Sequence, residues 1–343
     1  MSTSARFLKS QAGMQATFET AVTPTFTLPF AGEYEDAGDF NEAELDDGRW
    51  IPSKIIDRVS NYATFRLRGA AFFEMLPILN NAMFAYTAPV GAGAPFAYNY
   101  ELDLTVPGTP RPYTFMFGGG EDLGATGPAV RIADCYCQSY VLSGNMNDRS
   151  VSLESNWFGA GVDDNSGAGY DFAAVAMPSP LGMLRFPYST LEYEDATTTG
   201  SVFTTMTAMN CRLMDWRLSV NGGLRAQWSA DANQLTMCGV FIDTPSIQLE
   251  ATIRTDATTY AAVRGKAESQ TYQELQFTLT GASSRAAIFQ MTGRWLPVTN
   301  VHARSNGEVV MTGTFDSGGY PSQTTTPHAF GYQIATAWSH ASP

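Results

Sequence analysis

The stretch NYATFRLRGAAFFEMLPILNNAMFAY, residues 61–86, combines a strand pattern with one short apolar helix, whereas most other segments of the chain alternate like β-strands. An apolar stripe at helical spacing predicts that this helix covers one face of a small β-sandwich. The stripe consists of Phe72, Met75, Leu76, Leu79 and Met83. Because proline is disfavoured inside a helix, Pro77 predicts either a kink or a helix that begins only one turn before it.

The segments on either side are typical of antiparallel β-structure. YNYELDLTV (98–106) alternates apolar and polar residues, and after the turn PGTP (107–110) the segment RPYTFMFGG (111–119) is predicted to return as its hairpin partner. Residues 137–159 predict a second hairpin, with an inward face formed by Val151, Leu153, Ser155 and Trp157. Asn-Gly at 221–222 separates two alternating runs and predicts a third hairpin.

A helix is predicted once more in the second half, at 255–266, after a strand at 246–254. Thr255 and Asp256 are its candidate N-caps, and Gly265 is its candidate end. This order of strand and helix is the one that opens the first half. The chain is therefore expected to contain the same arrangement twice.

The strands after the second helix support such an internal duplication. ELQFTLTG (274–281) and RAAIFQMTG (285–293) correspond to the two strands of 98–119. Residues 306–318 repeat the inward face of 151–157, here with Val309, Met311, Gly313 and Phe315.

The predicted fold is mainly β, with two tandem β-sandwich or barrel domains that each carry one flanking α-helix. The domains are expected at 1–175 and 209–343, and the first includes a long acidic loop at 31–58. The segment 176–208 is interpreted as a connector, because it contains prolines at 178, 180 and 187 and then a threonine-rich run.

The composition excludes several classes of protein. Lys and Arg number 20 against 33 acidic residues, a net charge of −13, so the whole chain does not attract nucleic acid. No apolar run is long enough for a membrane helix and no export signal is recognised, so a soluble, unexported protein without membrane contact is expected. The four cysteines lack paired spacing and are interpreted as reduced core residues: Cys135, Cys137, Cys211 and Cys238.

Motifs for chemistry are weak. The acidic block GEYEDAGDFNEAELDD (32–47) could bind calcium or supply two carboxylates for hydrolysis, but such a block is more typical of a solvated or partner-binding loop and lacks calcium-loop spacing. The oxygen-rich segment 162–171 and the glycine-rich segment 117–127 are interpreted as a turn and a loop. The three histidines show no zinc-hydrolase spacing. No catalytic residue, metal or cofactor is predicted, and the protein is not expected to be an enzyme.

The order of elements, the acidic chain and the opening QAGMQATFETAVTPTFTLPF (11–30) together resemble the tail tube (major tail) proteins of long-tailed bacteriophages. Together with the internal duplication, the resemblance implies two tail-tube-type domains, although many family members have one, in a structural virion protein that self-assembles into stacked rings. The rings form the hollow tube for genome delivery, with sheets of neighbouring subunits joined in an inner barrel, the helix outside and the long loop reaching the next ring. If single-domain relatives form six-fold rings, a duplicated chain fills them as a pseudo-hexameric homotrimer.

The resemblance also implies sites and partners. The expected ring–ring contact is the loop at 31–58, with candidates Glu33, Glu35, Asp36, Asp39, Asp46, Asp47, Arg49, Trp50 and Lys54. Candidate lumen-facing residues are Asn99, Glu101, Asp103, Gln276, Thr278 and Thr280. The partners are other copies, tail proteins at the tube ends, and DNA as transiting cargo, which an acidic wall would not retain. The expected location is the virion, after assembly in the host cytoplasm.

Two alternatives belong to other classes. A carbohydrate-active β-sandwich hydrolase would use two acids of the 32–47 block, but that block is too polar to raise the pKa of one of them. An outer-membrane barrel would explain the alternating strands, but the predicted helices and the missing export signal count against it.

Overall fold

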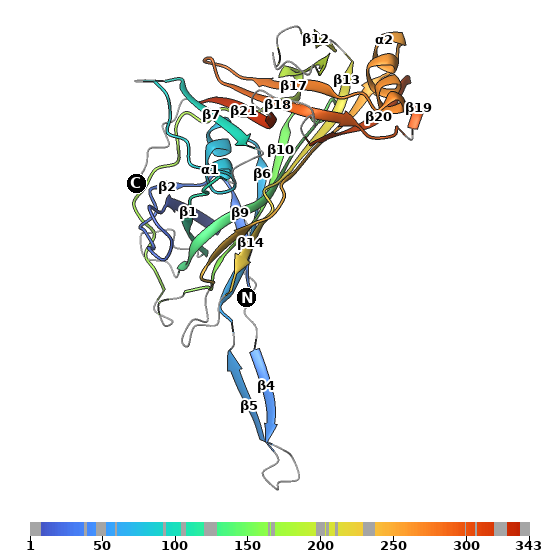
Figure 1. The fold of residues 1–343 in the computed structure, drawn as a ribbon. Coiled ribbons are helices and arrows are strands. Elements are labelled where there is room, and N and C mark those ends of the chain that lie inside the picture. Colours follow the sequence, from blue (N-terminus) through green and yellow to red (C-terminus); the bar gives the residue numbers. More distant parts are fainter. Residues whose placement is uncertain are drawn as a thin grey trace.

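The computed structural model shows a mainly β chain (Figure 1). It describes residues 8–37, 40–45, 53–58, 60–91, 94–103, 108–119, 129–163, 165, 169–196, 203, 206–209, 212–228, 237–298, 300–305, 307–318 and 328–336. The strands up to residue 160 are β1 (Leu8–Met14), β2 (Phe26–Thr27), β3 (Ala31–Asp36), β4 (Phe40–Leu45), β5 (Ser53–Arg58), β6 (Tyr62–Ala70), β7 (Phe96–Asp103), β8 (Tyr113–Gly119), β9 (Ala129–Asn145) and β10 (Val151–Ala160).

The later strands are β11 (Ser189–Asp195), β12 (Thr207–Ala208), β13 (Leu213–Asn221), β14 (Leu224–Gln227), β15 (Gly239–Ile242), β16 (Ser246–Arg254), β17 (Gln273–Thr280), β18 (Ala286–Trp295), β19 (Asn300–Ser305), β20 (Glu308–Ser317) and β21 (His328–Thr336). The helical segments are a 3-10 turn (Phe73–Met75), α1 (Leu76–Asn81), a second 3-10 turn (Phe186–Tyr188), α2 (Ala257–Thr259), a π-helical turn (Tyr260–Gly265) and α3 (Lys266–Ser269).

A long antiparallel sheet crosses both halves of the chain in the order β3–β6–β10–β9–β13–β16–β20–β19. The first half supplies β3–β6–β10–β9, and the second half supplies β13–β16–β20–β19 with the same pairings. The two sets meet where β9 pairs with β13, with Asn145 opposite Asp215 and Ser139 opposite Asn221. We call this the long sheet.

The corresponding strands also agree in register. β6 and β16 both have 9 residues and both precede a helical segment. When β6 is aligned with β16, Ala70 corresponds to Arg254. The residues opposite them, Ser152 on β10 and Val310 on β20, therefore also correspond. The predicted inward faces of β10 and β20 therefore correspond residue by residue. Their residues are buried, apart from Val309 at the start of β20, which is 42% exposed.

A second layer packs on one face of the long sheet. Its strand order is β7–β21–β18–β17–β11–β12. Separately, β8 pairs with the N-terminal part of β9, and β1 pairs with β8. Trp216 of the long sheet and Phe277 of the second layer are in contact, with ring centroids 4.5 Å apart. One apolar cluster contains buried residues from both halves, so burial of apolar surface holds the two halves together.

The first helix is confirmed. The 3-10 turn follows β6, and α1 begins at Leu76, one residue before Pro77, where the missing proline N–H breaks no helical hydrogen bond. All residues of α1 are buried, and the hydroxyl of Tyr100 on β7 donates to Asn81 at 2.8 Å. The helix therefore lies on the core side of the long sheet, enclosed between neighbouring elements.

The second helix begins as predicted but ends later. The Asp256 carboxylate accepts hydrogen bonds from the backbone N–H groups of Thr258 and Thr259, both at 2.9 Å, so Asp256 is the N-cap. The predicted end at Gly265 is wrong, because this residue keeps right-handed helical angles within the π-helical turn. Gln270, with a φ of 53°, takes the left-handed conformation that ends the helix after Ser269.

Two predicted hairpins are wrong for the same reason: both edges of a strand are already occupied by distant strands. β8 pairs with β1 and β9, so β7 pairs instead with the C-terminal strand β21. β13 pairs with β9 and β16, so β14 pairs instead with β15. At Asn221 the chain leaves the long sheet through Gly223, whose φ of +68° favours glycine.

The predicted long loop at 31–58 consists largely of strands. β3 forms an edge of the long sheet, and β4 and β5 pair as a hairpin that projects from the body (Figure 1). The hairpin of β14 and β15 occupies the corresponding place in the second half, between β13 and β16.

The connector at 176–208 contains a packed element, in contrast to the predicted linker. β11 pairs with β17 along its whole length, and the segment buries Leu184, Phe186 and Leu191. These apolar side chains offset the cost of ordering a proline-containing segment. Of this segment, β11 and β12 therefore belong to the second layer.

Candidate functional site

The long sheet has a polar face opposite the core. Because side chains alternate along a strand, buried residues such as Leu67, Leu142 and Leu218 are followed by polar residues that point the other way. We call this polar surface the open face. It comprises Glu33, Glu35, Thr64, Arg66, Arg68, Ser143, Asn145, Ser152, Glu154, Asn156, Asp215, Arg217, Ser219, Gln248, Glu250, Arg254, Thr312, Thr314 and Asp316.

The carboxylates of the open face outnumber its arginines. Arg68 lies 3.0 Å from the carboxylate of Glu154, and Arg254 lies 2.6 Å from that of Glu308. Strand register places Arg217 opposite Glu250. Such exposed pairs contribute little to stability, but each reduces the positive charge that an arginine presents to an anion.

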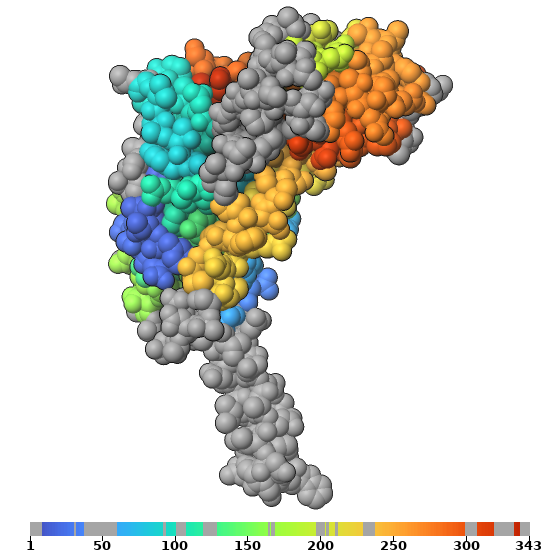
Figure 2. Space-filling view, in the orientation of Figure 1, coloured from blue at the N-terminus to red at the C-terminus, as the bar shows by residue number. Residues whose placement is uncertain are grey.

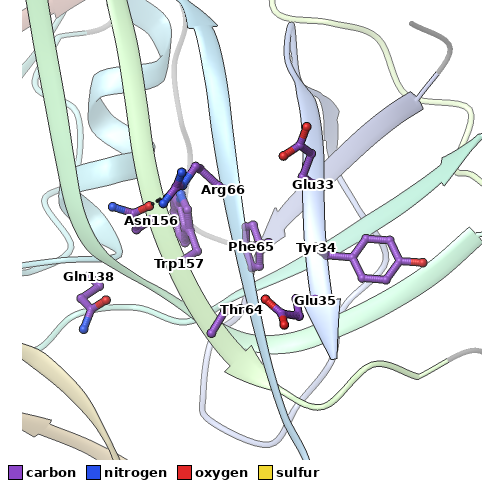
Figure 3. Close-up of a pocket in the computed structure, with 9 residues that line it drawn as sticks. All are labelled: Glu33, Tyr34, Glu35, Thr64, Phe65, Arg66, Gln138, Asn156 and Trp157. Atoms are coloured by element: carbon purple, nitrogen blue, oxygen red, sulfur yellow. Dashed lines mark hydrogen bonds between the residues drawn. The ribbon is translucent and has the colours of Figure 1, made fainter. Parts of the chain in front are cut away.

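The open face is hollowed near β3, where a cavity of about 600 Å³ lies between β3, β6, β10 and β9 (Figure 3). Glu33 and Glu35 project from β3 on the opposite side from Tyr34. The ring of Tyr34 stacks on that of Phe117, with ring centroids 5.7 Å apart. The Arg66 Nε donates to the Asn156 side-chain oxygen at 3.0 Å in this cavity. The lining is polar and both acids are exposed.

Solvent exposure of the two acids does not favour glycosidase chemistry in this cavity. A carboxyl group that acts as a general acid requires a dry environment to keep its proton at neutral pH. Glu33 and Glu35 are both exposed to solvent. In the part of the chain that the structure describes, no group of three or more His, Cys, Asp or Glu residues is placed to hold a metal ion.

The structure places the described members of the predicted ring–ring set on two strands. Glu33, Glu35 and Asp36 lie on the edge strand β3. Lys54 lies on β5 in the projecting hairpin. The others lie outside the described residues: Asp39, Asp46, Asp47, Arg49 and Trp50.

The predicted lumen-facing residues lie in the second layer and not in the long sheet. Asn99, Glu101 and Asp103 are on β7, and Gln276, Thr278 and Thr280 are on β17 of the same layer. Most residues of the open face were not identified from the sequence. Their signal is the alternation of polar residues at positions such as 64, 66 and 68, but the sequence does not show which strands share a sheet.

A buried ion pair joins distant parts of the chain. Arg285 Nε donates to Glu74 Oε1 at 2.7 Å, and both side chains are almost fully buried. The Gly182 N–H donates to the other carboxylate oxygen at 2.8 Å, and Arg285 also donates to the Pro180 carbonyl at 2.6 Å. This network connects the turn after β6, the 180–182 segment and the β17–β18 turn.

A pair of carboxyl groups lies in the second layer. Glu194 on β11 stands opposite Glu274 on β17, and Glu274 is only 2% exposed. Burial, followed by the neighbouring Glu194, raises the pKa of Glu274 to about 7, although a hydrogen bond from the Phe203 N–H at 3.0 Å acts in the opposite direction. At neutral pH the two carboxyl groups therefore share a proton for part of the time.

Two of the described thiols are enclosed in the core. Cys135 and Cys137 are free and buried, as predicted, and burial raises the pKa of both thiols well above the ordinary value. Cys238 is free and half-buried. Cys211 lies outside the described residues.

A comparison of the chain with models of known protein families finds no match, and a comparison with curated proteins also finds none. Within the described ranges, no helix has both the length and the apolar character needed to cross a membrane.

Proposed function

We propose that this protein is a structural virion protein that polymerises into the tail tube of a long-tailed bacteriophage. Three copies form a pseudo-hexameric ring, the rings stack into a hollow tube, and the genome passes through it. The observation that carries the proposal is the long sheet. It consists of two corresponding four-strand sets that join edge to edge at β9 and β13.

The two ends of the long sheet provide the contact between copies. Among the described strands, β3 pairs only with β6, and β19 pairs only with β20. Exposed sheet edges tend to pair with another chain. In the two four-strand sets, β9 corresponds to β19, and β13 corresponds to β3. Pairing of β19 of one copy with β3 of the next would therefore repeat the β9–β13 junction and continue the sheet. Three such junctions would close it.

The internal junction predicts the register between copies. Arg217 of β13 stands opposite Ser143 of β9. By the strand correspondence, Glu33 takes the place of Arg217 and Ala303 takes the place of Ser143. Glu33 of one copy is therefore expected opposite Ala303 of the next. The edge strands also differ in charge, because β3 carries Glu33, Glu35 and Asp36, whereas β19 carries Arg304.

The open face then forms the channel wall in place of the residues on β7 and β17. Its excess of carboxylates, and the carboxylates beside its arginines, give DNA phosphates few cations to bind, so the genome slides as cargo. The second layer lies outside the barrel. Other tail proteins contact the tube ends, and the protein performs no catalysis.

Cross-linking tests this arrangement. In the variant with Glu33→Cys and Ala303→Cys, oxidation is expected to link three chains covalently, because directly opposite residues in antiparallel strands place their Cβ atoms about 4.5–5.5 Å apart. The readouts are a non-reducing gel and electron microscopy of the purified protein. The matched control combines Ala303→Cys with Asp36→Cys, which is out of register and should link poorly. Purified protein without rings would contradict the tube function, whereas rings without specific cross-links would contradict only the register.

Removal of the projecting hairpin is expected to stop growth at single rings. Residues 40–58 are replaced by a short Gly-Ser linker, because β3 must be kept and Asp36 already lies opposite Ala63 on β6. Circular dichroism should show a strand content reduced only by the deleted β4 and β5. Native mass should show three-chain rings, and electron microscopy should show no tubes. Tubes of parental length from this variant would show that the hairpin makes no essential ring–ring contact.

A further inference from the structure

The β14–β15 hairpin exposes two large aromatic side chains that the contact between sheet edges does not use. Trp228 is 46% exposed and Phe241 is 58% exposed. Arg225 stands opposite Phe241 in the hairpin, and its side chain is 70% exposed. Tryptophan and arginine are the residue types that most often dominate the binding energy of protein interfaces, and exposed aromatic groups are costly without a partner.

These side chains stand on a well-packed base. Leu224 and Met237 are almost completely buried against Tyr136 and Phe158 of the long sheet. The ring of Trp228 lies 5.9 Å from that of Tyr62. The hairpin therefore holds both aromatic groups in fixed positions, with Trp228 on its sheet-facing side and Phe241 on its outer side, and a fixed position reduces the entropy cost of binding.

The hairpin marks one end of the long sheet. It connects the end of β13 to the start of β16, next to the start of β6 at Tyr62. The hairpin of β4 and β5 projects from this same end (Figure 1). In the space-filling view, the yellow surface of this region reaches the lower end of the described body (Figure 2).

The opposite end of the long sheet contains a second apolar surface. A hollow of about 460 Å³ there is lined by Met183 and Tyr188, which are 42% and 52% exposed. Arg185, also in the lining, forms a β-bridge with Ser150 in the β9–β10 turn, and this turn exposes Met146 by 40%. At about 3.3 Å per residue, the length of β6 separates the two ends by roughly 26 Å.

We propose that the β14–β15 hairpin of one copy docks, through contacts of Phe241 and Trp228, at the Met183–Tyr188 hollow of a copy in the next ring. This inference rests on the proposed tube function and identifies its axial contact. The partner is a second copy because the two surfaces lie at opposite ends of the same strands. A head-to-tail contact of this kind repeats without closing and produces a filament. Methionine suits the receiving side, because its flexible thioether adapts to aromatic rings.

The test uses two variants and one control. The hairpin variant carries Trp228→Ser and Phe241→Ser, and the hollow variant carries Met183→Asp and Tyr188→Asp. Each alone is expected to form three-chain rings by native mass but tubes at least tenfold shorter by electron microscopy. The control, Val90→Ser, changes a side chain that is 61% exposed elsewhere and should form tubes of parental length. Because Trp228 packs on Tyr62, Phe241→Ser alone is measured as well and should also shorten the tubes.

Mixing the two variants separates a direct contact from a general loss of assembly. Rings of the hairpin variant keep an intact hollow, and rings of the hollow variant keep intact aromatic groups. A mixture should therefore form discrete pairs of rings, because only one of the two junctions is complementary. Parental tube length from the hairpin variant, or a mixture without ring pairs, would overturn the inference and leave the tube function in place. A parent chain that forms no rings would refute the tube function itself.

Discussion

Arg285→Ala is expected to lower the free energy of unfolding by about 3–5 kcal/mol, the range found when one partner of a buried ion pair is removed. The variant leaves the carboxylate of Glu74 fully buried and without its cation. The Gly182 N–H would remain as a hydrogen-bond donor, but one neutral donor does not compensate a buried charge. Urea denaturation followed by tryptophan fluorescence measures the loss.

An exposed arginine provides the matched control. Arg264 forms an i,i+4 pair with Glu268 at 2.6 Å on the surface of the second helix, so Arg264→Ala should change stability very little. The double variant with Glu74→Met and Arg285→Met removes both charges and should recover most of the loss. If the double variant were as unstable as Arg285→Ala, the loss would come from packing and not from the buried charge.

This ion pair matters for the proposed assembly because of the elements it joins. Glu74 follows β6 of the long sheet, and Arg285 precedes β18 of the second layer. The pair thus fixes the second layer against the first half of the long sheet. A chain that presents β3 and β19 as fixed edges needs such connections, since movement between its halves would misalign the junctions of a closed ring.

Local patterns predicted the elements that local interactions determine. Residues 151–157 alternate because one face is buried, and Asp256 caps a helix because its side chain reaches backbone groups two and three residues away. Pro77 marks the start of α1 for an equally local reason. Each of these features is visible within about ten residues of sequence.

Strand partners depended on distant residues and were not predictable in the same way. Asn221-Gly222 has the composition of a hairpin turn, but β9 occupies the edge of β13 that a hairpin partner would need. The partner of β7 is β21, more than two hundred residues away. The open face, the Glu74–Arg285 pair and the Glu194–Glu274 pair are products of this long-range pairing, so residue types alone did not reveal them.

The free energy of unfolding is expected to fall as the pH rises from about 5 to 8, because the folded state keeps a proton on the Glu274 carboxyl group. The folded-state pKa of about 7 lies above the ordinary value of 4.5, so the folded state binds this proton more tightly than the unfolded state. The stabilisation is complete at pH values below the ordinary pKa of 4.5, and it is lost as the pH rises through about 7. At about 1.4 kcal/mol per pKa unit, the difference between about 7 and 4.5 corresponds to a loss of at most about 3.5 kcal/mol.

Glu274→Gln removes the titrating group and keeps the shape of the side chain, so the pH dependence over this range should become much weaker. The reason is that the glutamine amide opposite Glu194 is uncharged and does not repel the Glu194 carboxylate at high pH. Glu192→Gln is the matched control, since Glu192 lies on β11 near Glu194 but accepts a hydrogen bond from Gln276 at 2.9 Å. Chemical denaturation at intervals of half a pH unit gives the slopes.

The choice of pH range isolates the pair from other groups. The pKa values of Asp163 and Asp256 are lowered by hydrogen bonds and nearby arginines, so both carboxylates lose their stabilising effect only at more acidic pH. Burial raises the pKa of Asp134, which adds a slope of the same sign, but Asp134 is present in both the parent and the variant. The difference between their slopes therefore reports Glu274 alone. Equal slopes in the parent and in Glu274→Gln would show that the two carboxyl groups do not share a proton near neutral pH.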